Sequence, residues 1–154
     1  MISIKKDNDY VKELLKLEEG IHLDFKQSIT NQLKISKTMA AFANTKGGKL
    51  VIGVSDNRQI IGIDVDEEIF MVEEANKKYI TPPVEYTFEI YEINYIDEEK
   101  LKEEIHILIV NIEESLSKPH FINSNEMSKT FYIRKADKSL PIIDPTIIQK
   151  LSSS

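Results

Sequence analysis

The stretch from Ala40 to Asp56, AAFANTKGGKLVIGVSD, constrains the fold more than any other part of the chain. Apolar and small residues recur before it with helical spacing, which predicts a helix that begins near Gln32. Gly47 and Gly48 end this helix, because glycine adopts a positive φ without a Cβ clash. Leu50–Ile52 then forms a short apolar run, typical of a strand covered on both faces. The sequence therefore predicts a helix, a glycine turn and a buried strand in direct succession.

The strand end at Asp56 leads into a turn, and residues 60–63 follow at hairpin distance as a second predicted strand. A helix that delivers polar groups to a glycine turn beside a carboxylate is compatible with a phosphate or nucleic-acid site. It is also compatible with an ordinary connection from helix to strand, and spacing alone leaves both interpretations open. The run KGGK is not a P-loop, because that motif places its glycines between a strand and a following helix.

Periodicity predicts the other elements and the fold class. Alternation over 21–26 places Leu23 and Phe25 on the core side of a strand, and Asp24 and Lys26 on the opposite side. We expect an α/β (α+β) fold, with one compact domain over 1–154, a core at about 9–150 and a mixed or antiparallel sheet packed by helices. The further predicted elements are helices over 9–18 and 64–78 and after Asp144, strands over 84–93, 104–112 and 130–134, and a polar mobile loop over 115–129.

Composition narrows the class of protein. No cysteine is present, which excludes disulfides and thiolate metal sites and fits a cytoplasmic protein. No apolar run approaches the ~20 residues of a membrane span, and the N-terminus lacks the apolar segment of a signal peptide, so we expect no membrane association. The net charge is −6, yet residues 1–50 carry nine Lys/Arg against six Asp/Glu. This excess indicates either a local nucleic-acid face or a solvated helix surface.

Two groups of charged residues are candidates for chemistry. If their strands are neighbours, Glu19, Asp24 and Asp56 could converge at one end of the sheet, where clustered carboxylates would hold Mg²⁺ or Mn²⁺. With 26 acids along the chain, a suggestive trio also arises by chance. Arg134 ends a predicted strand that contains Tyr132, and Lys135 and Lys138 follow in a turn. Such a group suits a phosphate or a single-strand contact as well as a charged, protected strand edge.

The spacing of several motifs resembles the AlbA-like domain of the Schlafen family, once described as a divergent AAA or ATP-binding domain. The resemblance covers roughly residues 9–150. It is carried by Glu19 with Asp24-Phe25-Lys26, by the AFANTKGG run and LVIGVSD, by Ile61-Gly62, and by Pro119 with FYIR and Ser139.

The resemblance implies an α/β domain that binds DNA or RNA, seen in bacterial regulatory proteins and in animal Schlafens. The residues expected to contact phosphates are Lys26, Lys46, Lys49, Arg134 and Lys135. In nuclease-active relatives three carboxylates and a divalent metal cut structured RNA, and their positions map to Glu19, Asp24 and Asp56. Asp24 departs from the glutamate most often found there, which shifts the carboxylate by about one methylene. Active animal enzymes pair two such lobes, so one chain of this kind would need a homodimer.

We therefore expect a nucleic-acid-binding domain of a regulatory protein. The alternatives are a metal-dependent endoribonuclease acting through the three carboxylates, an ATP- or nucleotide-binding regulatory module, and a protein-interaction domain that uses the acidic second half of the chain.

Overall fold

The computed structural model describes residues 2–125 and 128–153. Their helices and strands, in chain order, are β1 (Ile4–Lys5), α1 (Asn8–Leu15), β2 (Leu23–Lys26), α2 (Gln32–Asn44), β3 (Gly48–Ile52), α3 (Val65–Tyr79), β4 (Ile80–Thr81), β5 (Tyr86–Ile96), β6 (Glu99–Ile112), β7 (Phe121–Asn125), β8 (Ser128–Lys135), β9 (Lys138–Ile142) and α4 (Pro145–Ser152). No helix among the described residues is both long and apolar enough to cross a membrane.

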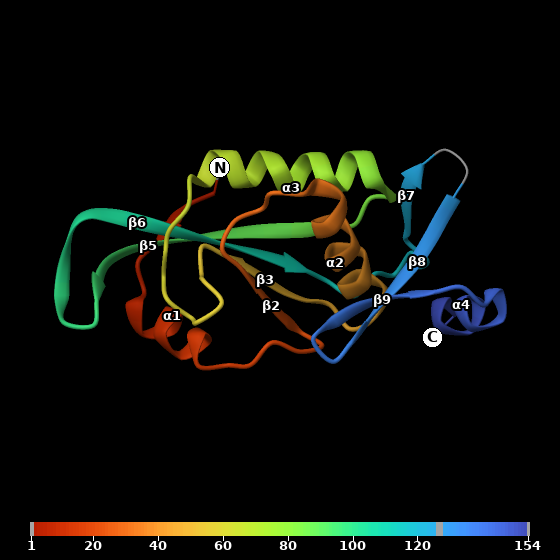
Figure 1. Cartoon of the computed structure of the whole chain (residues 1–154), viewed down its shortest axis with the longest axis horizontal. Helices are drawn as coiled ribbons and strands as arrows, with labels where there is room; N and C mark the ends of the chain where they lie inside the picture. The colour runs from red at the N-terminus through yellow and green to blue at the C-terminus, as the bar shows by residue number, and fades with distance from the viewer. Residues whose placement is uncertain (1, 126–127, 154) are drawn as a thin grey trace.

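A mixed five-stranded sheet forms the centre of the molecule, in the order β1-β5-β6-β3-β2. Strands β2 and β3 run parallel, and α2 connects them. Strands β3, β6 and β5 are antiparallel neighbours, and the long β5–β6 hairpin extends away from the rest of the molecule (Figure 1). Because β3 is an inner strand, Leu50, Val51 and Ile52 are fully buried, as their apolar run predicts.

Helices cover both faces of this sheet. On one face, α2 and α3 bury their apolar sides in the larger core, which includes Met39, Phe42 and Val72. On the other face, α1 packs with Val11 and Leu14 in a second core. Asn31 caps α2 by accepting a hydrogen bond from Lys34 N (3.0 Å), and α2 has the bounds that periodicity predicts. Asp64 and Asp144 cap α3 and α4 in the same way.

A second, four-stranded sheet, β4-β7-β8-β9, packs against α2. The prediction of a loop over 115–129 is wrong at residues 121–125, which form β7. Phe121 and Ile122 pair with β8, and Ile122 is part of the core. Residues 126–127 of that predicted loop lie outside the described part. Helix α4 projects beyond this sheet at one end of the molecule (Figure 1). The second sheet places β8 and β9 beside α2.

The strand predicted over 60–63 does not form. Only a single bridge joins Val54 to Ile60. Gly53 and Gly62 both have positive φ, and Gly53 O accepts hydrogen bonds from the amides of Ile61 and Gly62. The chain therefore closes a tight loop here, and Ile63 continues toward His106 of β6.

The glycine turn serves close packing. A Cβ on Gly47, whose φ is +73°, would lie 2.8 Å from the backbone atoms Glu114 N and Ile112 O. A Cβ on Gly48 would lie 2.7 Å from the Phe42 ring. The two glycines let β3 begin directly against α2 and the end of β6, which explains the motif without a phosphate cradle.

A charged cluster on the α1 side of the sheet joins β1, β3, β5 and β6 through Glu89. Its carboxylate accepts hydrogen bonds from Lys5 Nζ and Asn111 Nδ2, both at 2.8 Å, and lies 3.6 Å from Lys49 Nζ. Partial burial alone would raise the pKa of Glu89, but these hydrogen bonds and lysine charges prevail and lower it to about 2.

Glu89→Gln is expected to lower the free energy of unfolding at pH 7 by about 2 kcal/mol. The pKa of Glu89 is lower in the folded protein than in the unfolded chain, so its carboxylate stabilises the fold at any pH above the unfolded-state pKa. The difference from the parent protein should shrink as the pH falls from about 4.5 toward 2, where the Glu89 carboxylate of the folded protein takes up its proton. Urea denaturation across this pH range measures it, and Glu85→Gln at an exposed position is the control. A difference that does not change with pH would contradict the assignment.

Candidate nucleic-acid interface

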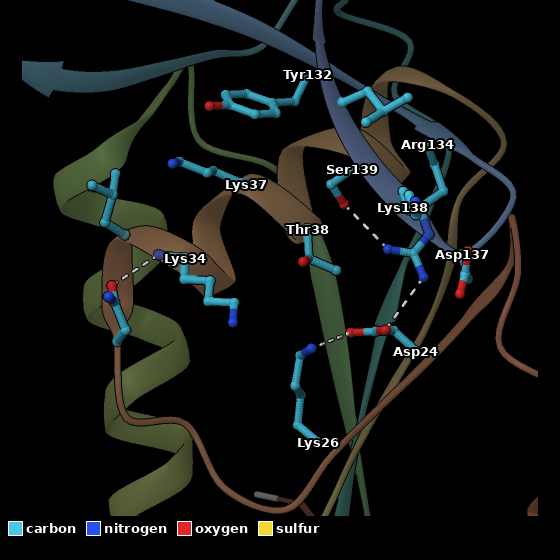
Figure 2. A pocket seen from close by; sticks show the side chains of 13 residues that line it. Asp24, Lys26, Lys34, Lys37, Thr38, Tyr132, Arg134, Asp137, Lys138 and Ser139 are labelled. Carbon is cyan, nitrogen blue, oxygen red and sulfur yellow. Dashed lines mark hydrogen bonds and ion pairs between the residues drawn. The ribbon is translucent and has the colours of Figure 1, made fainter. Parts of the chain in front are cut away.

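A groove of about 560 Å³ lies between α2, β2 and the β8–β9 hairpin (Figure 2). We call it the lysine groove, because four lysines line it: Lys26 of β2, Lys34 and Lys37 of α2, and Lys138 of β9. Its other charged residues are Arg134, Asp24 and Asp137. The groove is therefore cationic, although the chain as a whole carries a net charge of −6.

Local structure explains how these lysines meet. Lys34 and Lys37 are three residues apart on α2, so both lie on one side of the helix. Lys26 is the last residue of β2 and faces the same space from below in Figure 2. The tight β8–β9 turn, in which Lys135 pairs with Lys138, brings Lys138 to the opposite wall.

An ion pair between Asp24 and Arg134 forms the floor of the groove. Arg134 Nη2 donates to Asp24 Oδ1 at 3.3 Å, and the exposed fractions of the two residues are 3% and 4%. The guanidinium also donates to Gly20 O, Leu23 O and Ser139 Oγ at 3.0–3.2 Å. Asp24 is buried on the predicted polar side of β2 because Arg134 neutralises it there.

This geometry changes the expected role of Arg134. Its guanidinium lies 4.8 Å from the Phe42 ring, and its amide donates to Thr45 Oγ1 at 2.9 Å. Arg134 therefore ties β8 to β2 and to the end of α2. With its donors used internally, it is a structural tie in this conformation and not a free phosphate ligand.

The second oxygen of Asp24 is less well satisfied than the first. Lys26 Nζ lies 3.2 Å from Oδ2, within ion-pair distance. Oδ2 is buried, and its neighbours are this ammonium group and the Glu19 carboxyl, which forms a side-chain hydrogen bond with Asp24. Asp24 is therefore held by Arg134, Lys26 and Glu19 together.

Glu19 lies beside Asp24 at the outer edge of β2. Its carboxylate accepts a hydrogen bond from Phe25 N at 3.0 Å. Partial burial and the neighbouring Asp24 carboxylate raise the pKa of Glu19, and the Phe25 hydrogen bond opposes this rise. The structure therefore brings together two of the three predicted carboxylates.

The third predicted carboxylate, Asp56, lies on an exposed turn after β3. Within residues 2–125 and 128–153, no three His, Cys, Asp or Glu side chains form a group that could hold a metal ion. Glu19 caps a backbone amide and Asp24 is paired with Arg134 and Lys26, so the three residues do not fit a divalent metal in this arrangement. Metal-dependent catalysis through Glu19, Asp24 and Asp56 stays a prediction, and we derive no step from it.

The five residues predicted to contact phosphates do not lie on one surface. Only Lys26 and the buried Arg134 line the lysine groove. Lys46 and Lys49 line another pocket beside the glycine turn, on the α1 side, where Lys49 Nζ donates to Asn111 Oδ1 at 2.5 Å. Lys135 is exposed on the β8–β9 turn.

The sequence interpretation did not name Lys34 or Lys37 as phosphate contacts, and it included Lys138 only in the group around Arg134. The spacing of Lys34 and Lys37 places both on the more solvent-exposed face of α2, a helix that the sequence predicts correctly. That these two face a cavity depends on the second sheet, and Lys138 lies in the unpredicted strand β9.

Comparison with known families decides which group of proteins the chain belongs to. A family model described as "Schlafen, AlbA_2" matches residues 19–143. The chain belongs to the Schlafen AlbA_2 family. The matched region of this Schlafen AlbA_2 domain runs from Glu19 to the end of β9, so it contains all three walls of the lysine groove.

A solved structure supports the fold of the Schlafen AlbA_2 domain. The DIP2311 protein from Corynebacterium diphtheriae superposes with a TM-score of 0.53 at 17% sequence identity, over 86% of this chain. The match spans 25% of the DIP2311 chain, so the domain corresponds to about a quarter of that protein. At this identity the similarity shows the fold alone.

Proposed function

We propose that this Schlafen AlbA_2 domain binds nucleic acid, and that the phosphate backbone lies in the lysine groove. The single observation that carries the proposal is the convergence of Lys26, Lys34, Lys37 and Lys138, from three parts of the chain, on one concave surface. Lysines act as point charges toward phosphate, and grouped cations release counterions when they bind a polyanion.

Electrostatics inside the groove support the proposal. The Asp24 carboxylate is neutralised by Arg134, so it subtracts little from the field of the lysines. Lys34 and Lys138 are exposed, and Lys37 is half-buried. No ion pair holds these three lysines to another described residue, so their ammonium groups can turn toward a ligand without breaking an ion pair. Lys37 has a cation–π contact with the Tyr132 ring.

The test is a triple variant, Lys34→Gln, Lys37→Gln and Lys138→Gln. Fluorescence anisotropy with a labelled oligonucleotide should show at least tenfold weaker binding at low salt. Between about 50 mM and 200 mM salt, the slope of log K against log salt should fall in magnitude by about 2, since each lost phosphate contact with a single strand removes about 0.7.

A matched control is Lys12→Gln, Lys77→Gln and Lys78→Gln, which removes the same charge from α1 and α3, outside the groove. This control should keep most of the parent affinity and nearly the same salt slope. Equal losses in the two triple variants would mean that net charge, and not the groove, determines binding. No binding by the parent protein at low salt would overturn the proposal.

The nuclease and nucleotide alternatives stay predictions. The carboxylates are not grouped as a metal site among the described residues, and both glycines of the turn are explained by packing. No observation in this fold favours either alternative over phosphate binding by the lysine groove.

A further inference from the structure

The lysine groove has the size of a small-ligand site. Its volume of about 560 Å³ lies within the range of about 300–1,000 Å³ that is usual for such pockets. A nucleic-acid duplex presents its phosphates on a convex surface and keeps its bases stacked inside. A concave pocket of this size instead suits one or two units of a strand whose bases are not paired.

One wall of the groove offers an aromatic surface. Tyr132 of β8 is half-buried, and Lys37 Nζ lies 5.5 Å from the centre of its ring (Figure 2). Asn44 Nδ2 donates to the Tyr132 carbonyl at 2.9 Å, which fixes the backbone beneath the ring. The Tyr132 hydroxyl makes no hydrogen bond to any described residue, so core packing and not a polar partner holds the ring.

The floor of the groove is polar, but its charges are already paired. Asp24 is only 4% exposed and forms ion pairs with Arg134 and Lys26, so it repels an incoming phosphate little. The hydroxyl of Thr38, which is also buried, faces the groove beside it (Figure 2).

From these features we infer that the lysine groove takes an unpaired nucleotide, with its base stacked on Tyr132 and its phosphate among the lysines. The inference rests on the proposed function and adds the form of the nucleic acid. Base stacking on an aromatic ring tolerates all four bases, so the preference concerns strandedness and not sequence.

The experiment compares Tyr132→Leu and Tyr132→Phe with the parent protein. The probes are labelled single-stranded RNA, single-stranded DNA, a duplex of the same sequence, and inorganic polyphosphate as a competitor without bases. Tyr132→Leu should bind both single strands between about 5-fold and 100-fold more weakly, the usual effect of losing one stacked base, while Tyr132→Phe stays near the parent. Competition by polyphosphate should be unchanged in both variants.

The parent should bind a single strand at least tenfold more tightly than the duplex. Single-stranded RNA and single-stranded DNA should both bind, because stacking on Tyr132 does not require a ribose hydroxyl. Equal binding of duplex and single strand, or unchanged single-strand binding by Tyr132→Leu, would overturn it while leaving phosphate binding intact. If Tyr132→Leu also weakened polyphosphate competition, the ring would be structural. Failure of the parent to bind any of the four probes would overturn the proposed function itself.

Discussion

Arg134→Met is expected to lower the free energy of unfolding by about 3–5 kcal/mol, the usual cost of leaving a buried charge without its partner. The change removes the ion pair with Asp24 and the donors to Gly20 O and Leu23 O. Methionine retains much of the apolar volume against Phe42, so the loss reports mainly on charge and hydrogen bonds. Urea denaturation followed by far-ultraviolet circular dichroism measures it.

Two further variants make this result specific. Lys135→Met changes the neighbouring exposed residue of β8 and should stay within about 0.5 kcal/mol of the parent. Asp24→Leu combined with Arg134→Met should cost less than the sum of the two single changes, because each single change leaves one charge buried alone. Additive losses, or a loss below about 1 kcal/mol for Arg134→Met, would show that the pair is not coupled.

Asn44→Leu is expected to lower the free energy of unfolding by about 3 kcal/mol, because it leaves buried backbone groups without partners. Asn44 Nδ2 donates to His120 O and Tyr132 O at 3.0 and 2.9 Å, and Asn44 Oδ1 accepts from His120 N at 2.9 Å. Leucine has a similar volume but makes none of these bonds. Urea denaturation measures the loss, and Gln149→Ala on the exposed face of α4 is the control.

Hydrogen exchange gives the Asn44 prediction a local readout. The amide of His120 donates its hydrogen bond to the Asn44 side chain. In Asn44→Leu, the protection of this amide against hydrogen exchange should therefore fall by more than the protection of amides in β3. If protection at His120 were retained, Asn44 would not be the group that holds the second sheet against α2.

Sequence reasoning succeeded where local signals and burial agree. The bounds of α2 follow from its cap at Asn31 and from an apolar surface that continues to the glycine turn. The inner strand β3 is apolar on both faces because both faces are covered. Family resemblance added the AlbA-like fold, which the match over residues 19–143 confirms.

The second sheet and the groove could not be predicted in the same way. Strands β7 and β9 are only five residues long each, and their pairing with β8 depends on neighbours that periodicity does not identify. Asp24 is predicted to face solvent because its buried partner, Arg134, is 110 residues away along the chain. In the sequence, Lys34 and Lys37 have the spacing of two residues on an ordinary solvent-exposed helix face. Only the position of β8 and β9 shows that they line a groove.

The position of Glu19 has a consequence for the behaviour of this domain in concentrated solution. Strand β2 is the outermost strand on its side of the central sheet, where free amides would template pairing with another molecule. Glu19 occupies the amide of Phe25, and Gly20 exchanges hydrogen bonds with Leu23, so this margin offers an incoming chain few donors. Glu19 therefore makes this margin of the sheet a poor template for pairing with a strand of another molecule.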